Sequence, residues 1–141
     1  MAEAPKWVAA SVVLAIHDEQ VAEHGGGAGL RDQGLLESAL YRPRNIFAYE
    51  NASLAQLAAA YAYGVCKNHP FVDGNKRTSL VVAELFLAIN GHELQSTDVE
   101  CVIVWQKLAA GDMDEQELGK WFTQHIAHAC EDRRARTSVS L

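Results

Sequence analysis

The segment 68–78 reads Asn-His-Pro-Phe-Val-Asp-Gly-Asn-Lys-Arg-Thr, and it gathers an imidazole, a carboxylate, two cations and a glycine in one short stretch. A helix is expected to begin near Asn75, and the first turn of a helix exposes unpaired N–H groups and the positive end of the helix dipole. Lys76 and Arg77 in that turn are unfavourable without an anionic partner, whereas phosphate groups bind there readily. The segment therefore indicates a phosphate site.

The other side chains of this segment fit phosphoryl or nucleotidyl transfer. Asp73 is a hard oxygen ligand of the kind that holds Mg²⁺ together with substrate phosphates. Gly74 lets the backbone approach a ligand or adopt a positive φ, and His69 can accept a proton from an attacking hydroxyl near neutral pH. Asn75 can donate to a phosphate oxygen, and Arg77 can donate to two. The alternative is structural, because Asp-Gly-Asn is a common turn and a single histidine usually packs.

Six helices in one domain are expected to position this segment. Helix formers outnumber the β-branched residues, and with only 3 prolines in the chain an all-β fold is disfavoured. Apolar residues recur at helical spacing, and no internal repeat separates them. The expected helices cover about 6–24, 33–42, 54–68, 75–90, 97–111 and 118–129.

The helix that begins near Asn75 is expected to be the buried centre of the fold, because residues 80–89 are apolar almost all round. Residues 1–130 then form one domain. Residues 131–141 are polar and arginine-rich and are expected to form a frayed tail.

The stretch after Pro43 is expected to leave the helical pattern. Proline disfavours helical geometry in the residue before it, so the second helix should end there. Residues 44–51 are then irregular or extended, with Phe47 and Tyr49 in a short β-like run.

Composition limits the class of protein. The chain has 141 residues, 49% hydrophobic and 21% charged, which fits one soluble domain. The formal net charge of −6 argues against a protein that coats nucleic acid, so no direct nucleic-acid partner is expected. The 3 cysteines are widely spaced and predict no disulfide framework. With no signal pattern and no apolar run of about 20 residues, we expect a cytoplasmic protein without a membrane partner.

The phosphate-site segment resembles the signature of the Fic/Doc family, which reads here His69-x-Phe71-x-Asp73-Gly74-Asn75-Lys76-Arg77. Other segments are similar to death-on-curing toxins, namely Ile16-His17-Asp18, Gly25-Gly26, Gly29-Leu30-Arg31-Asp32, Leu35–Leu40, Glu84–Leu87 and Asn90-Gly91. The resemblance covers most of the chain. It implies an all-α, single-domain Fic/Doc-type bundle of about six helices around a buried central helix. It also implies a target-docking flap at 44–50, a short β-hairpin that would include Phe47 and Tyr49; ordinary packing of these two rings is the alternative.

The resemblance also assigns a role to each position of the signature. It implies that His69 deprotonates a target hydroxyl and that Asp73 binds Mg²⁺. It further implies that Asn75 and Arg77 hold phosphates, and that Phe71 anchors the loop in the core.

Two positions resemble the Doc branch rather than most Fic adenylyl transferases, which have glycine at Lys76 and a second arginine at Leu80. Doc-type proteins transfer the γ-phosphate of ATP to a threonine of elongation factor Tu and arrest translation, and Lys76 would then contact the terminal phosphates. Lys67 lies where Doc toxins carry a basic residue. Gly74 follows the general Fic pattern instead, so adenylyl transfer remains an alternative, as does a non-catalytic partner-binding member of the fold.

A separate antitoxin of the Phd type is expected as a partner. Many Fic enzymes carry an inhibitory helix with a Ser/Thr-x-x-x-Glu pattern followed by Gly or Asn. The nearest match here is Ser96–Glu100, which Cys101 follows, and we do not accept it.

Three other chemistries are weaker. His17-Asp18 is similar to the dipeptide of metal phosphohydrolases, but no histidine precedes it. His69 with Asn75 suggests an HNH nuclease, whose ββα unit does not match the helical pattern. A zinc site from His125, His128 and Cys130 is disfavoured because His125 falls on an apolar helix face.

Overall fold

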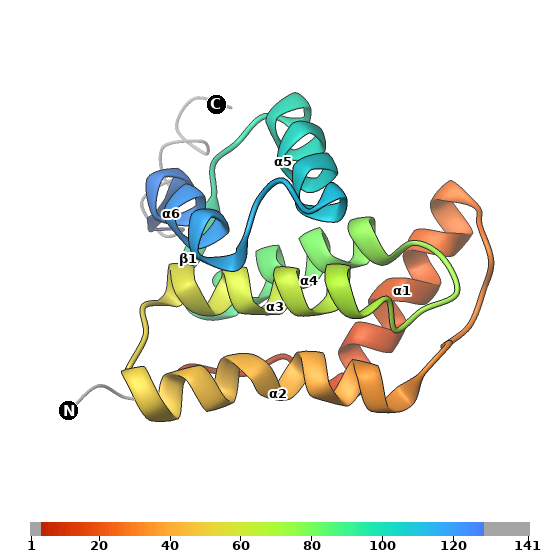
Figure 1. The fold of residues 1–141 in the computed structure, drawn as a ribbon, viewed down its shortest axis with the longest axis horizontal. Helices are drawn as coiled ribbons and strands as arrows, with labels where there is room; N and C mark the ends of the chain where they lie inside the picture. The colour runs from red at the N-terminus through yellow and green to blue at the C-terminus, as the bar shows by residue number, and fades with distance from the viewer. Residues whose placement is uncertain (1–3, 129–141) are drawn as a thin grey trace, which may run out of the picture.

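A computed structural model describes residues 4–128, and six helices and two short strands form within them (Figure 1). The all-α class is therefore confirmed; the expected tail at 131–141 lies outside the described residues. No helix within 4–128 is long and apolar enough to cross a membrane. The elements are α1 (Ala10–His24), α2 (Gln33–Glu50), α3 (Leu54–Asn68), α4 (Asn75–Ile89), β1 (His92–Leu94), α5 (Asp98–Ala110), α6 (Glu115–His125) and β2 (Ile126–His128).

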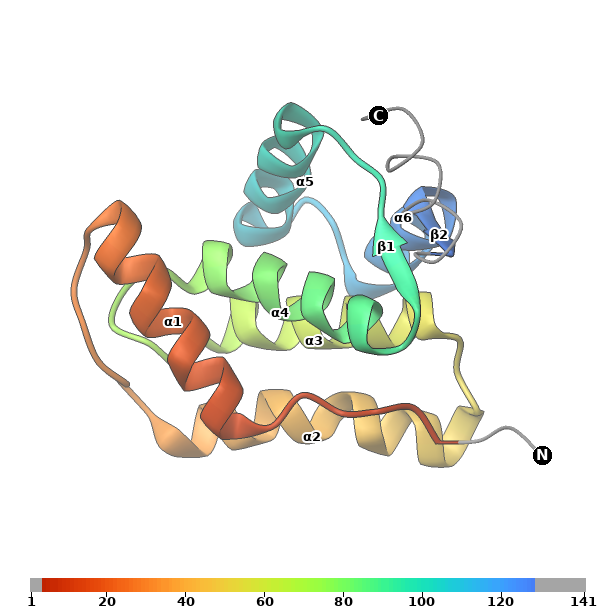
Figure 2. The same ribbon diagram turned by 180° about the vertical axis from the view of Figure 1, so that it is seen from behind.

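Helices α3 and α4 run side by side through the middle of the molecule (Figures 1 and 2). α2 and α6 pack against α3, and α1 packs against α4. Of the 15 residues in each central helix, ten are buried in α3 and seven in α4, so α3 shares the centre that the sequence assigned to α4 alone. The alanines at 58–60 allow this, because their small side chains let neighbouring helices approach α3 closely.

Four of the six described helices begin after a residue whose side chain caps them, whereas α1 begins at Ala10 rather than near residue 6 and α6 at Glu115 rather than near residue 118. Asp32 accepts a hydrogen bond from the N–H of Leu35 at the start of α2. Ser53, Thr97 and Asp114 each form a complete capping box at the starts of α3, α5 and α6. Each cap satisfies N–H groups that the first turn would otherwise leave unpaired.

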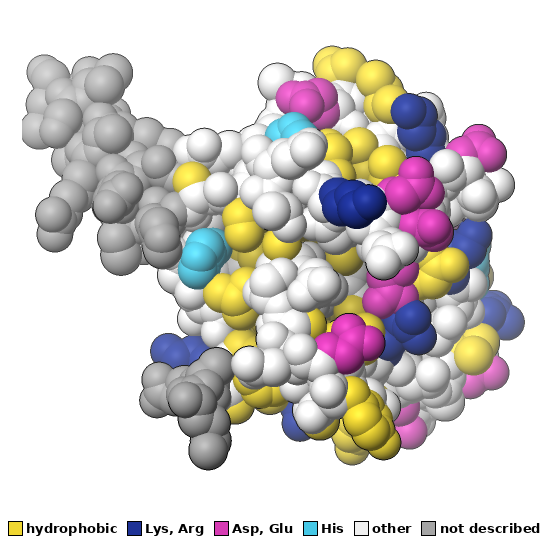
Figure 3. Space-filling view, turned by 60° about the vertical axis from the view of Figure 1, so that its left-hand side comes forward, with side chains coloured by type: hydrophobic (Ala, Val, Ile, Leu, Met, Phe, Trp, Pro, Cys, Tyr) yellow, Lys and Arg dark blue, Asp and Glu magenta, His cyan; other side chains and the backbone are white. Residues whose placement is uncertain are grey.

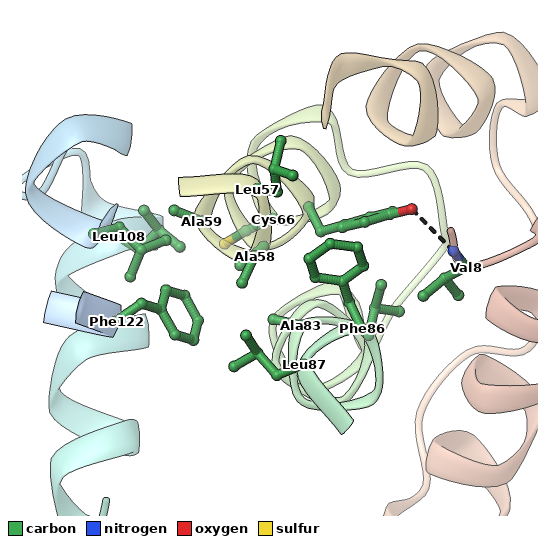
Figure 4. Packing of buried hydrophobic residues seen from close by; sticks show 14 of the residues in the cluster. Val8, Leu57, Ala58, Ala59, Cys66, Ala83, Phe86, Leu87, Leu108 and Phe122 are labelled. Atoms are coloured by element: carbon green, nitrogen blue, oxygen red, sulfur yellow. Dashed lines mark hydrogen bonds between the residues drawn. The ribbon is translucent and has the colours of Figure 1, made fainter. Parts of the chain in front are cut away.

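Aromatic rings fill the core on one side of the central pair. Phe86 contacts the ring of Tyr61, with 5.0 Å between centroids, and stacks on Trp7. The N–H of Val8 donates to the Tyr61 hydroxyl at 3.0 Å, which fixes the segment before α1 to the core (Figure 4). On the other side Phe122 of α6 is buried in the same cluster (Figure 4).

The expected end of the second helix at Pro43 is wrong, because α2 continues to Glu50 and its C-cap Asn51 has the left-handed φ of 51°. Proline removes one backbone hydrogen bond from a helix. Pro43 is buried here, so packing of the α2 face against α3 outweighs that loss.

The β-hairpin flap expected at 44–50 is therefore absent, since that segment is the last part of α2. Phe47 packs edge-on against Trp7 with 6.0 Å between centroids, which is the ordinary packing weighed as its alternative. Tyr49 is 89% exposed on the final helical turn. The small sheet lies elsewhere, where β1 pairs antiparallel with β2. The last helix accordingly ends at His125 rather than near 129.

Figure 3 shows most of the acidic and basic side chains of this face close together on its right-hand side, with hydrophobic atoms exposed among and beside them. Arg42 forms an ion pair with Glu115, which links α2 to α6. Arg44 lies 5.6 Å above the ring of Trp7. Each of these two arginines therefore contacts a neighbouring side chain.

Two helical glycines give opposite predictions for stability. A Cβ at Gly64 of α3 would lie 3.2 Å from the backbone of Ala39 in α2, whereas a Cβ at Gly119 would meet only ordinary contacts at 3.9 Å. Gly64→Ala should lower the free energy of unfolding by about 1 kcal/mol, because overpacking outweighs the gain in helix propensity. Gly119→Ala should raise it by up to about 1 kcal/mol. Urea denaturation of both variants measures the difference; equal shifts would contradict the close α2–α3 contact.

Candidate active site

The loop that joins α3 to α4 holds the segment singled out in the sequence, and a left-handed residue stands at each end of it. His69, the C-cap of α3, has φ 51° and ψ 54°, and Gly74, the N-cap of α4, has φ 77° and ψ 16°. Glycine adopts this geometry freely, whereas a histidine does so only when surrounding contacts hold it. The geometry of the loop therefore depends on the groups that bind its backbone.

The Asn75 side chain forms hydrogen bonds with the backbone of the loop. Its amide oxygen accepts from the N–H of Phe71 at 3.0 Å, and its amide nitrogen donates to the Phe71 carbonyl at 3.0 Å. The same nitrogen lies 3.3 Å from Nδ1 of His69. Both amide hydrogens are thus engaged within the loop, and Asn75 is only 5% exposed. Its role as a phosphate donor stays a prediction, which in this arrangement falls to its backbone N–H.

His17 of α1 contacts the buried side of the loop. The sequence analysis did not predict that His17 supports the loop. Its ring stacks on Phe71, with centroids 3.8 Å apart and planes 6° apart. Its Nε2 donates to the carbonyl of Asp73 at 2.7 Å, and the side chain is 1% exposed. A position four residues after the buried Val13 is the signal in the sequence, since it places His17 on the inward helix face.

The Asp73 carboxylate is exposed and is fixed by two backbone donors. The N–H of Gly74 donates to one oxygen at 2.8 Å, and the N–H of Gly27 donates to the other at 3.3 Å. These hydrogen bonds, with the charge of Arg77 as a smaller cause, hold the pKa of Asp73 below its ordinary value. The group is therefore a carboxylate at neutral pH.

A carboxylate of this kind fits Mg²⁺ better than it fits a metal that the protein must hold alone. Each oxygen of Asp73 keeps a free lone pair beside its backbone hydrogen bond. Within residues 4–128 no three His, Cys, Asp or Glu side chains gather closely enough to form a metal cage. Mg²⁺ is commonly bound by one or two carboxylates with substrate phosphates completing its shell.

A pocket of about 700 Å³ opens above the start of α4. Its lining joins the loop residues His69 and Asp73 to Lys76 and Arg77 of the first helical turn. Gln20 and His24 at the end of α1 form one wall, and Leu80, Val81, Val102 and Trp105 of α4 and α5 form an apolar one. The structure thus brings an imidazole, a carboxylate and two cations to one cavity large enough for a nucleotide.

Lys67 and the two aromatic residues of the predicted flap lie away from this pocket. Lys67 donates from Nζ to the carbonyl of Leu108 at 3.4 Å, in the last turn of α5, where a cation is favoured by the helix dipole. Phe47 and Tyr49 lie on the last part of α2. None of the three residues lines the pocket.

Two further titratable side chains, those of Cys101 and His125, do not suggest another chemistry. Cys101 lines the pocket, but burial raises the pKa of its thiol, so it is not a ready nucleophile. His125 stacks on Trp121, and its Nε2 lies 3.3 Å from Glu100. Of the other weighed zinc ligands, Cys130 lies outside the described residues.

The fold is thus a helical bundle whose α3–α4 loop presents an imidazole, a carboxylate and two cations beside the N-terminus of α4. Residues 7–87, more than half of the chain, match the model of the Fic/DOC family, and the chain belongs to that family. It is 38% identical over 80 residues to "Protein kinase doc" of Escherichia phage P1, covering 56% of this chain and 64% of that protein. It is 43% identical over 74 residues to "Toxin Doc" of Mycolicibacterium smegmatis, covering 50% and 55%. The matches therefore span less than two thirds of either relative.

Two neighbouring glycines test how closely the 25–29 loop approaches Asp73. Gly25 and Gly26 both have positive φ, so an alanine at either costs about 1–2 kcal/mol in backbone strain. Only at Gly26 would the added Cβ lie 2.6 Å from a carboxylate oxygen of Asp73. Gly26→Ala should therefore separate the carboxylate from the N–H of Gly27 and raise the pKa of Asp73, and Gly25→Ala should leave that pKa unchanged. An NMR titration of the Asp73 carboxyl carbon decides; the same pKa in both variants would contradict the contact.

Proposed function

We propose that this chain is a Doc-like toxin that transfers the γ-phosphate of ATP to a hydroxyl, on a threonine, of a protein target, and that the target is elongation factor Tu, so that translation is inhibited. The observation that carries the proposal is the convergence of His69, Lys76 and Arg77 on one pocket at the start of a buried helix. The name of one relative, "Protein kinase doc", supports the hypothesis that the chain transfers a phosphoryl group.

ATP is proposed to bind with its phosphates over the first turn of α4. The backbone N–H groups of that turn, with Lys76 and Arg77, supply donors and positive charge. The apolar wall that includes Leu80 and Val81 suits the less polar surface of the nucleoside. Asp73 would hold Mg²⁺, which supplies charge neutralisation at the phosphates when it is bound.

The transfer itself requires one bond to form and one to break. The threonine oxygen attacks the γ-phosphorus while the bond from that phosphorus to the β–γ bridging oxygen breaks, and ADP leaves. The hydroxyl proton passes to His69, which lines the pocket and is exposed. Lys76 and Arg77 stabilise the charge on the phosphoryl oxygens, since positioning and charge stabilisation dominate this reaction.

The tautomer of His69 matters for this step. Because the Asn75 amide faces Nδ1, the hydrogen of the neutral ring is assigned to Nε2. The contact of 3.3 Å is long for a hydrogen bond, so it holds this tautomer weakly. Proton acceptance at Nε2 requires release of that contact and transfer of the ring hydrogen to Nδ1.

Adenylyl transfer to a protein hydroxyl is the second candidate, and Gly74 favours it. The left-handed φ of 77° at this position is met by the glycine of the general Fic signature. Leu80 opposes it, because this apolar residue lines the pocket where most Fic adenylyl transferases carry a second arginine.

A Phd-like antitoxin in the cytoplasm is the proposed partner. Two relatives carry the name Doc, and one is named a toxin. Ser96–Glu100 does not offer an internal inhibitor, because Glu100 closes the capping box with Thr97 and pairs with His125. Inhibition at the pocket would then come from a separate chain.

Labelled ATP separates the two transfer reactions. Incubation with elongation factor Tu should transfer the label from the γ-phosphate of ATP, whereas adenylyl transfer would carry the α label. His69→Ala should lower the rate by about 10²- to 10⁴-fold, as expected for loss of a general base, with an unchanged melting temperature. Transfer of neither label to any protein would favour the non-catalytic member of the fold.

ATP affinity tests the phosphate site without any transfer. Arg77→Ala should weaken ATP binding in calorimetry by roughly 10- to 100-fold, the value of a charge-assisted hydrogen bond. Arg44→Ala serves as a control, because Arg44 is an exposed arginine on α2 that contacts Trp7 and does not line the pocket. Equal affinities in the two variants would remove Arg77 from the phosphate site.

A further inference from the structure

The Arg31 side chain caps the end of α3 from the loop that precedes α2. Its Nε donates to the carbonyl of His69 at 2.7 Å, and its Nη2 donates to the carbonyl of Asn68 at 3.0 Å. The last carbonyls of a helix have no partner within the helix, and the negative end of the helix dipole also favours a cation there. A single guanidinium thus satisfies two consecutive carbonyls at the point where the chain leaves α3.

Backbone hydrogen bonds between the same two segments continue along the loop. The N–H groups of Arg31 and Asp32 both donate to the carbonyl of Pro70, at 2.7 and 3.0 Å. The N–H of Val72 donates in turn to the carbonyl of Gly29 at 3.1 Å. Three carbonyls in a row, at 68, 69 and 70, therefore accept hydrogen bonds from Arg31 or its neighbour.

The middle one of these three carbonyls belongs to His69, whose backbone is left-handed with φ 51°. A non-glycine residue keeps that conformation when its surroundings over-determine it. The backbone angles of His69 set the direction in which its ring leaves the chain. A donor on its carbonyl therefore acts on the direction of the imidazole.

We propose that Arg31 is a positioning residue for the transfer reaction, which orients the His69 ring toward the bound hydroxyl without touching substrate. This inference rests on the proposed function. Arg31 does not line the pocket, so its effect passes through the backbone of His69. The planar guanidinium suits the task, because its fixed fork reaches two carbonyls at once, which the single ammonium of a lysine holds less rigidly.

The other supports of the loop act elsewhere. Asn75 holds the backbone of Phe71, and His17 holds the carbonyl of Asp73. Within residues 4–128, both side-chain donors to the carbonyls of Asn68 and His69 belong to Arg31. Loss of Arg31 should therefore disturb the imidazole and leave Lys76 and Arg77 in place.

The test replaces Arg31 by methionine and by lysine and compares each variant with the same change at Arg42. Arg42, which lies within α2, is a matched control. It also donates through Nε and Nη2, in this case to the carboxylate of Glu115 in α6. Arg31→Met should lower kcat by about 10- to 100-fold at an unchanged KM for ATP, as misplacement of a reacting group does. Arg31→Lys should recover part of that loss, and Arg42→Met should change neither constant.

A second readout does not depend on transfer. The imidazole signals of His69 in the ¹⁵N NMR spectrum, assigned with His69→Ala, should shift or broaden in Arg31→Met and remain as in the parent in Arg42→Met. If the parent transfers no phosphate, the proposed reaction fails and this spectrum alone decides the positioning role. Unchanged signals, a kcat equal to that of the parent, or an equal loss in Arg42→Met would each overturn the proposal.

Discussion

The structure depends most on how the backbone of residues 69–74 is satisfied. This loop leaves one helix and enters another through two left-handed residues, His69 and Gly74. Apart from the Gly74 carbonyl, which accepts from the N–H of Thr78, its backbone groups lie outside the regular hydrogen bonding of α3 and α4. An unpaired buried backbone group costs about as much as a lost hydrogen bond, so other parts of the chain must supply partners. The double hydrogen bond between Asn75 and the backbone of Phe71 is the central one, since it fixes the turn around a ring in the core.

Two segments distant in sequence complete that support, and their requirements explain their composition. The 25–32 loop must pass so close to Asp73 that a Cβ at Gly26 has no room. Helix α1 must present a flat, hydrogen-bonding ring beneath Phe71, which His17 provides. The fold can therefore be understood as a frame that holds six residues in an unusual path.

The sequence allowed prediction of what depends on neighbouring residues. The all-α class, the caps at Ser53 and Asp32 and the clustering of cations at the start of α4 follow from local spacing. The end of α2 did not, because burial of Pro43 outweighed the local preference to stop. The supporting role of His17 could not be read locally either, since its partner Asp73 lies 56 residues away. Lys67 shows the same limit, because the direction of its side chain depends on where α5 packs.

The side chains that hold the loop and the side chains that would act on a substrate belong to different residues with opposite environments. His17, Phe71 and Asn75 are buried and bind backbone or rings, whereas Asp73 and Lys76 are exposed. Burial makes the first set important for stability. Exposure makes the second set nearly irrelevant to it, because exposed charges are solvated in both the folded and the unfolded chain. Chemistry at the pocket can therefore change by substitution of exposed side chains while the path of the loop stays fixed, since the contacts that determine that path lie beneath it.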